Sequence, residues 1–78
     1  MANEENKIYR KTEIVGTSTK GWDDAGKTAI ARAMKTLRNV MWFEVKEHRG
    51  RISGSSDNFQ IEYQVTLDIG FQLEEPSK

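Results

Sequence analysis

FQIEYQVTLDIGFQL, residues 59–73, alternates apolar and polar residues without a break. Alternation with period two places successive side chains on opposite faces, so this stretch predicts a β-strand with one buried face. Such a strand would run for roughly 50 Å, whereas a compact domain of this size is only about 30 Å across. The strand must therefore curve strongly or pair in part with another subunit. Gly70 is a suitable position for a bend or bulge.

Three elements are predicted before this strand. Residues 7–15 are rich in β-branched and aromatic residues and predict a strand, and residues 21–38 carry apolar residues at helical spacing. A second strand is predicted at 42–52, followed by a turn at 53–58. Alanines on one stripe of the helix predict close packing on the sheet. If the long strand fills a gap left by a right-handed crossover, the sheet order is first, third, second, with the helix on one face.

The composition favours one small domain that associates with copies of itself. Residues 1–78 are expected to form a single α+β domain with flexible ends at 1–6 and 75–78. With no cysteine and a single histidine, His48, the chain has neither a disulfide nor a zinc cluster to support its small core. Association between copies is the remaining source of stability.

Charge and hydropathy exclude several classes of partner. Twelve basic and twelve acidic residues cancel, so no net field attracts nucleic acid or an anionic membrane. No apolar run approaches the roughly 20 residues of a membrane span, and the N-terminus is unlike a signal peptide. We therefore expect a cytoplasmic protein without nucleic-acid or membrane partners.

Candidates for catalysis or metal binding are few. The sequence has no nucleophile elbow, Walker loop or H-E-x-x-H motif. His48 has no second histidine or cysteine to share a metal ion, and it is interpreted as a strand residue at a surface or subunit contact. No catalytic residue and no metal site are predicted, and the chain is not expected to be an enzyme.

Trp42 and Gln64 are the strongest binding candidates. If Phe43 and Val45 face the helix, alternation turns Trp42 to the opposite face of the sheet, and the same argument sends Gln64 there. A flat apolar ring beside an amide suits a planar heterocycle such as a flavin, pterin or purine. The pattern alone favours the alternative, an interface anchor. Arg49 could bind a phosphate through its guanidinium fork, although a solvated strand edge fits its spacing better.

Four segments taken together resemble the dodecins, a small flavin-binding family. They cover most of residues 8–74 and read TEIVGTS (12–18), GWDDAGKTAIARAMKTLRNV (21–40), WFEVKEHRGRI (42–52) and YQVTLDIGFQLE (63–74). The resemblance implies a three-stranded antiparallel sheet wrapped around one helix, with the protomers assembled into a hollow homododecamer. It also implies flavin pairs, FMN or riboflavin, stacked at two-fold contacts. Trp42 matches the stacking tryptophan, Gln64 the glutamine at the polar ring edge, and Arg49 an arginine near the ribityl phosphate.

The implied function is flavin storage or sequestration with quenching of flavin photochemistry, and some dodecins also bind coenzyme A. Two alternatives stay open: a structural or interaction shell that assembles without flavin, and a flavin-dependent redox enzyme. The enzyme is disfavoured because stacking on both ring faces leaves no place for a substrate. The chain departs from the family pattern at Met41, where aspartate is common, and in its longer turn at 53–58. Trp22 and His48 have no family role.

Overall fold

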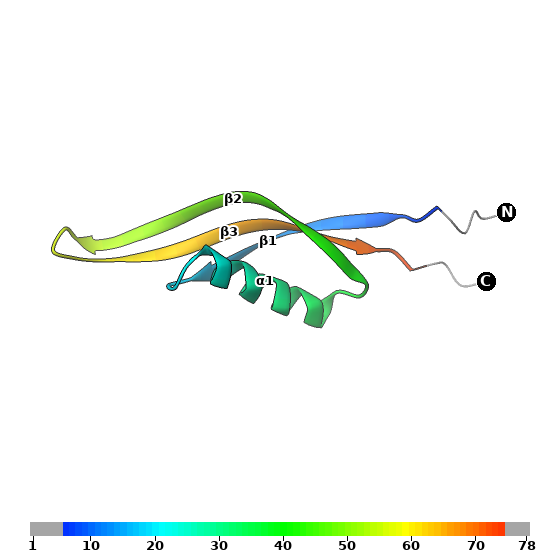
Figure 1. Ribbon diagram of the computed structural model, residues 1–78, viewed down its shortest axis with the longest axis horizontal. Helices are drawn as coiled ribbons and strands as arrows, with labels where there is room; N and C mark the ends of the chain where they lie inside the picture. The colour runs from blue at the N-terminus through cyan, green and yellow to red at the C-terminus, as the bar shows by residue number, and fades with distance from the viewer. Residues whose placement is uncertain (1–5, 75–78) are drawn as a thin grey trace.

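The computed structural model describes residues 6–74, which form one helix and three strands. In chain order these are β1 (Tyr9–Ser18), α1 (Trp22–Thr36), β2 (Val40–Ser55) and β3 (Asn58–Gln72). The strands make one antiparallel sheet in the order β1-β3-β2, with α1 on one face (Figure 1). The predicted topology is confirmed. The predicted flexible ends, 1–6 and 75–78, lie outside the described residues except for position 6.

Small residues allow α1 to lie close to the sheet. Ala25, Ala29 and Ala33 recur at four-residue spacing and are all buried. Opposite them on β1, a Cβ added to Gly16 would collide with the backbone oxygen of Ala25. The predicted close approach is therefore confirmed. The helix ends at Thr36, two residues earlier than predicted, because the chain turns extended immediately afterwards.

The hairpin between β2 and β3 is longer than predicted. The turn contains only Ser56 and Asp57, whereas the sequence predicted a turn over 53–58. That prediction was wrong because the polar residues after Ile52 continue the ladder, with Ser53 paired to Gln60. As a result, the hairpin projects beyond the start of α1 (Figure 1).

The core of one chain is small and its surface is large. The buried apolar residues are Ala25, Ala29, Ala33, Val65, Leu67 and Ile69. The radius of gyration is 17.1 Å, compared with about 11.5 Å for a compact chain of this length. The chain exposes 6483 Å², compared with roughly 4,900 Å² for a compact monomer of 9.0 kDa. The excess exposed area of a single chain is thus comparable to the area that a subunit buries when it assembles with others.

The two halves of the sheet are covered unequally. The helix packs mainly on β1 and β3, so the part of β2 that carries Phe43 and Val45 is half exposed.

Within residues 6–74, no helix is long and apolar enough to cross a membrane.

Candidate functional site

Trp42 lies on the outer face of the sheet, the face opposite α1. It pairs with Gly70 of β3, and a Cβ added to Gly70 would collide with three adjoining atoms of the indole ring. The ring therefore lies flat across a position that has no side chain. Trp42 is 36% exposed, so part of this large flat surface faces solvent. The indole thus packs directly against the backbone of Gly70.

Two neighbours, Glu44 and Tyr9, contact the indole of Trp42 and orient it, and Lys11 in turn holds Glu44. Its Nε1–H donates a hydrogen bond of 3.0 Å to Oε2 of Glu44. Lys11 Nζ lies 3.3 Å from both carboxylate oxygens of Glu44. The ring of Tyr9 meets the indole edge to face, with centroids 5.2 Å apart and planes at 72°. Edge-to-face pairs of this kind add to the stabilisation from burial.

Charges around the indole are balanced. The hydrogen bonds from Trp42 and then from Lys11 lower the pKa of Glu44 below its ordinary value of 4.5, because both donors favour the ionised carboxylate. Asp68 accepts ion pairs from Lys11 at 3.8 Å and from Lys46 at 3.6 Å. Glu44 thus stays ionised near neutral pH and keeps its bond to the indole.

Gln64 and Arg49 lie side by side in a row that crosses the sheet. Gln64 of β3 pairs with Arg49 of β2 on one side and with Thr17 of β1 on the other. We call these three residues the amide row. One N–H of the Gln64 carboxamide donates to Oε1 of Glu62 at 2.9 Å. The row offers a carboxamide, a guanidinium and a hydroxyl on the outer face, groups suited to a polar ring edge and a phosphate.

A strand irregularity brings the amide row to the same face as Trp42. Trp42 and Arg49 are an odd number of residues apart, so uninterrupted alternation would place them on opposite faces. The pairing shifts by one residue between Val45 and Glu47, which returns Arg49 to the outer face. On β3 the partner positions, Gly70 and Gln64, share that face by simple alternation. The prediction that Trp42 and Gln64 share one face is confirmed.

A single chain does not bring Trp42 and the amide row together. Gly70 and Gln64 are six residues apart on β3, which corresponds to about 20 Å. That distance is longer than a tricyclic ring can bridge. A planar ligand that touches both groups must therefore lie where two copies of the chain meet.

Trp22 and His48 lie on the helix side of the sheet, away from Trp42. The Trp22 ring meets Tyr63 at 4.9 Å and His48 at 5.6 Å, both edge to face. Its Nε1–H donates to the backbone oxygen of Arg49 at 2.9 Å. Trp22 thus connects the start of α1 to β2 and β3.

Sequence reasoning missed the residues that orient the indole: Tyr9, Glu44 and Gly70. The spacing of Trp42 and Glu44, two residues apart on one strand, was the available signal, because it places both on one face.

Within the described part of the chain, no group of three or more His, Cys, Asp or Glu residues could hold a metal ion.

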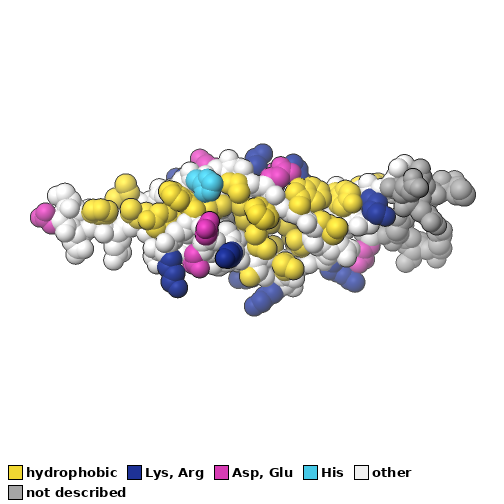
Figure 2. Space-filling view, in the orientation of Figure 1, with side chains coloured by type: hydrophobic (Ala, Val, Ile, Leu, Met, Phe, Trp, Pro, Cys, Tyr) yellow, Lys and Arg dark blue, Asp and Glu magenta, His cyan; other side chains and the backbone are white. Residues whose placement is uncertain are grey.

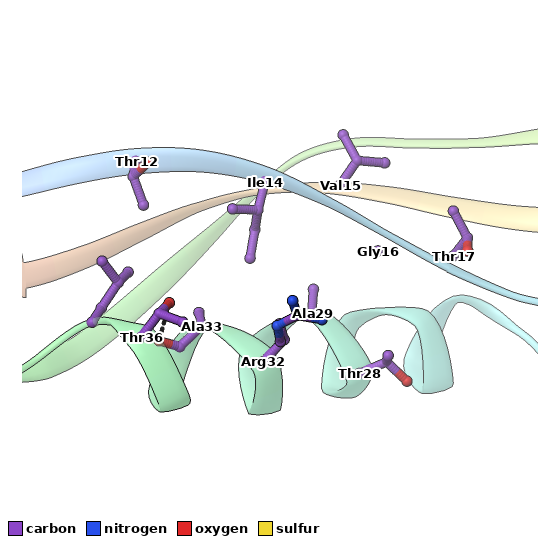
Figure 3. Close-up of a pocket in the computed structure, with 11 residues that line it drawn as sticks. Thr12, Ile14, Val15, Gly16, Thr17, Thr28, Ala29, Arg32, Ala33 and Thr36 are labelled. Carbon is purple, nitrogen blue, oxygen red and sulfur yellow. Dashed lines mark hydrogen bonds between the residues drawn. The ribbon is translucent and has the colours of Figure 1, made fainter.

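A separate groove of about 440 Å³ lies between β1 and α1, and none of the three predicted residues lines it (Figure 3). Figure 3 shows Ile14 pointing towards α1 and Val15 pointing away from it. The lining is mainly threonine and alanine, with Arg32 as its charged member. The groove shares Thr17 with the amide row, but Trp42, Gln64 and Arg49 lie outside it.

Comparison with known proteins agrees with this fold. The Dodecin family profile matches residues 8–74. A dodecin from Thermus thermophilus is 54% identical over 69 residues, covering 88% of this chain and 96% of that protein. The crystal structure of tt0972 protein from Thermus thermophilus superimposes with a TM-score of 0.80 at 52% identity, covering 91% of this chain and 100% of that one. Dodecin from Streptomyces coelicolor gives a TM-score of 0.81 at 46% identity, over 91% and 97% of the two chains. This chain belongs to the dodecin family.

Proposed function

We propose that this protein binds a flavin, FMN or riboflavin, on the exposed surface of Trp42, and that it stores or sequesters the flavin. The observation that carries the proposal is the indole lying flat over Gly70 and fixed by Glu44. A ring held in this way offers a flat apolar surface before the ligand arrives, so little conformational freedom is lost on binding. A stacked indole can donate an electron to light-excited flavin, which quenches its photochemistry.

The site is shared between copies in this proposal. The isoalloxazine ring stacks on Trp42 of one copy, and the amide row of another copy supplies Gln64 at the polar ring edge and Arg49 at the phosphate of FMN. The distance of about 20 Å between the two groups in one chain supports this arrangement. The large uncovered surface of the single chain supports assembly, which we propose to be a hollow homododecamer with flavin pairs at its two-fold contacts.

The proposed role is binding rather than catalysis. A flavin stacked between an indole and a second flavin has no open ring face for a substrate. We place the protein in the cytoplasm. Coenzyme A, which also carries phosphates, is a further candidate ligand.

The test is a titration of FMN and of riboflavin into purified protein, followed by flavin fluorescence. We expect strong quenching that saturates near one flavin per chain. Trp42→Ala should weaken binding by about 1–3 kcal/mol, the range for loss of aromatic stacking on a flat base. Phe43→Ala is the matched control, because it removes the neighbouring aromatic ring on the helix side of the sheet and leaves the outer face unchanged.

Two outcomes would contradict the proposal. Unchanged affinity in Trp42→Ala would remove Trp42 from the site. No quenching by either flavin in the assembled wild-type protein would instead favour a structural shell that binds no flavin.

A further inference from the structure

A negative charge lies directly at the nitrogen of the Trp42 indole. Oε2 of Glu44 accepts the Nε1–H hydrogen bond at 3.0 Å. Because the N–H bond lies in the plane of the ring, the carboxylate approaches the indole at its edge. The flat surface of the ring, which is partly exposed, therefore stays open to a stacked ligand while the charge remains in contact with the ring.

The row of the sheet that contains Glu44 carries more acidic than basic groups. Asp68 of β3 pairs with Glu44 on one side and with Glu13 of β1 on the other, so all three carboxylates lie on the outer face. Lys11 contacts Glu44 and Asp68, and Lys46 contacts Asp68. Two ammonium groups thus oppose three carboxylates, which leaves a surplus of negative charge beside the indole.

The local charges decide the potential at the ring. Acidic and basic side chains are interspersed on the face shown in Figure 2, and the chain as a whole has no net charge. Salt screens distant charges on a surface but has little effect on groups in direct contact. The contact with Glu44 is therefore the main electrostatic influence on the indole.

A carboxylate in this position stabilises positive charge on the indole. An indole that gives up an electron becomes a radical cation, and a fixed negative charge at its nitrogen lowers the free energy of that state. The Glu44 side chain is 43% exposed, so water weakens its field in the open chain. A flat ligand on the indole would displace part of this water and strengthen the interaction.

We propose that the charge of Glu44 makes Trp42 a faster electron donor to a light-excited flavin. The inference rests on the proposed function, because it requires a flavin stacked on Trp42. One electron passes from the indole to the excited flavin, which gives an indole radical cation and a flavin radical anion, and the same electron then returns. The N–H proton stays in the hydrogen bond, and nothing is consumed. Glu44 is thus a positioning residue whose charge also matters, and Lys11 opposes it by neutralising part of that charge.

The test is the excited-state lifetime of bound FMN, measured by transient absorption on protein saturated with FMN so that affinity does not enter. Glu44→Gln keeps a hydrogen-bond acceptor and removes the charge. We expect the lifetime to lengthen about twofold or more, because the radical cation loses its stabilising charge. Glu47→Gln is the matched control: it removes a carboxylate from the same face of β2, at a position whose partner Thr66 lies four residues from Gly70 on β3. A lifetime in Glu44→Gln equal to that of the wild type would overturn the inference.

A second variant separates the charge of Glu44 from its role in holding the ring. Lys11→Met removes the ammonium group that lies 3.3 Å from both oxygens of Glu44. If the charge matters, the lifetime should shorten, since the carboxylate is then less neutralised. If Glu44 only holds the ring, both variants loosen the indole and both lifetimes lengthen. Longer lifetimes in both variants would therefore overturn the inference.

The pH profile gives a further readout that a structural role would not produce. The lifetime in the wild type should lengthen as pH falls through the lowered pKa of Glu44, because protonation removes the charge. The charged groups that face Glu44 are Lys11 and Glu13 of β1, Lys46 of β2 and Asp68 of β3. Glu44→Gln retains all four groups and should show a flat profile over the same range. Identical profiles in the two proteins would contradict the inference.

Trp42→Phe distinguishes failure of this inference from failure of the proposed function. Phenylalanine keeps a flat ring but gives up an electron far less readily than an indole does. A lifetime that is long in Trp42→Phe and unaffected by Glu44→Gln would leave the flavin site at Trp42 in place and remove only the role of the Glu44 charge. An unchanged lifetime in Trp42→Phe would remove the site and, with it, this inference.

Discussion

Gly70→Ala tests whether the indole of Trp42 lies flat on β3. The added methyl group would occupy space that the indole fills, so the ring must tilt or β3 must shift. Overpacking of this kind costs about 1–3 kcal/mol. Without the ring, the same change should be neutral or stabilising by about 0.4–1 kcal/mol, because alanine restricts the unfolded chain. The destabilisation should therefore appear only when the tryptophan is present.

The assay is a double-mutant cycle of Gly70→Ala and Trp42→Ala, measured by urea unfolding at one protein concentration because assembly contributes to stability. FMN affinity is measured on the same proteins and should fall in Gly70→Ala, since a tilted ring no longer presents its flat surface. Gly50→Ala is the control, because its added Cβ would meet only Glu62 and Ile61 at ordinary or slightly tight distances. A cost for Gly70→Ala that is the same with and without Trp42 would refute the geometry.

Three further predictions concern the groups around the site. The hydrogen bonds that lower the pKa of Glu44 favour its ionised form, so their contribution to stability is present above pH 4.5 and is lost as pH falls through the lowered pKa. The melting temperature of the wild type should fall more on acidification than that of Glu44→Gln, and an equal fall would show that this carboxylate contributes nothing. Gln64→Ala should weaken flavin binding by about 1 kcal/mol without loss of assembly in light scattering; dissociation at normal flavin affinity would assign it a structural role instead. Arg49→Ala should weaken FMN more than riboflavin in parallel titrations, and equal losses would remove its phosphate contact.

The fold was largely predictable because β3 has an uninterrupted alternation. Every second residue from Phe59 onward lies on the helix side, and this pattern defines the buried face of the whole sheet. The three alanines of α1 likewise predicted its close packing. The hairpin length was not predictable from composition, because serine, glycine and asparagine suit both a turn and the solvent side of a strand.

Candidate residues for a site could be selected from the sequence, but the arrangement of these residues in the sheet could not. Alternation placed Trp42 and Gln64 on one face, whereas nothing in the sequence near Lys46 marks the register shift that brings Arg49 to the same face. The separation of about 20 Å between Trp42 and Gln64 follows from the register of β3 and was not used in the sequence argument. The bond from Trp42 to Glu44 depends on side-chain orientation, which a sequence pattern does not specify.

A crystal structure of the assembled protein with FMN tests the central claim most directly. We predict that the isoalloxazine ring lies flat against the indole of Trp42 in one copy and makes its polar contacts with Gln64 of a different copy. The flavin would contradict the account if it lay instead in the groove between β1 and α1. It would also do so if it contacted Trp42 and Gln64 of the same copy.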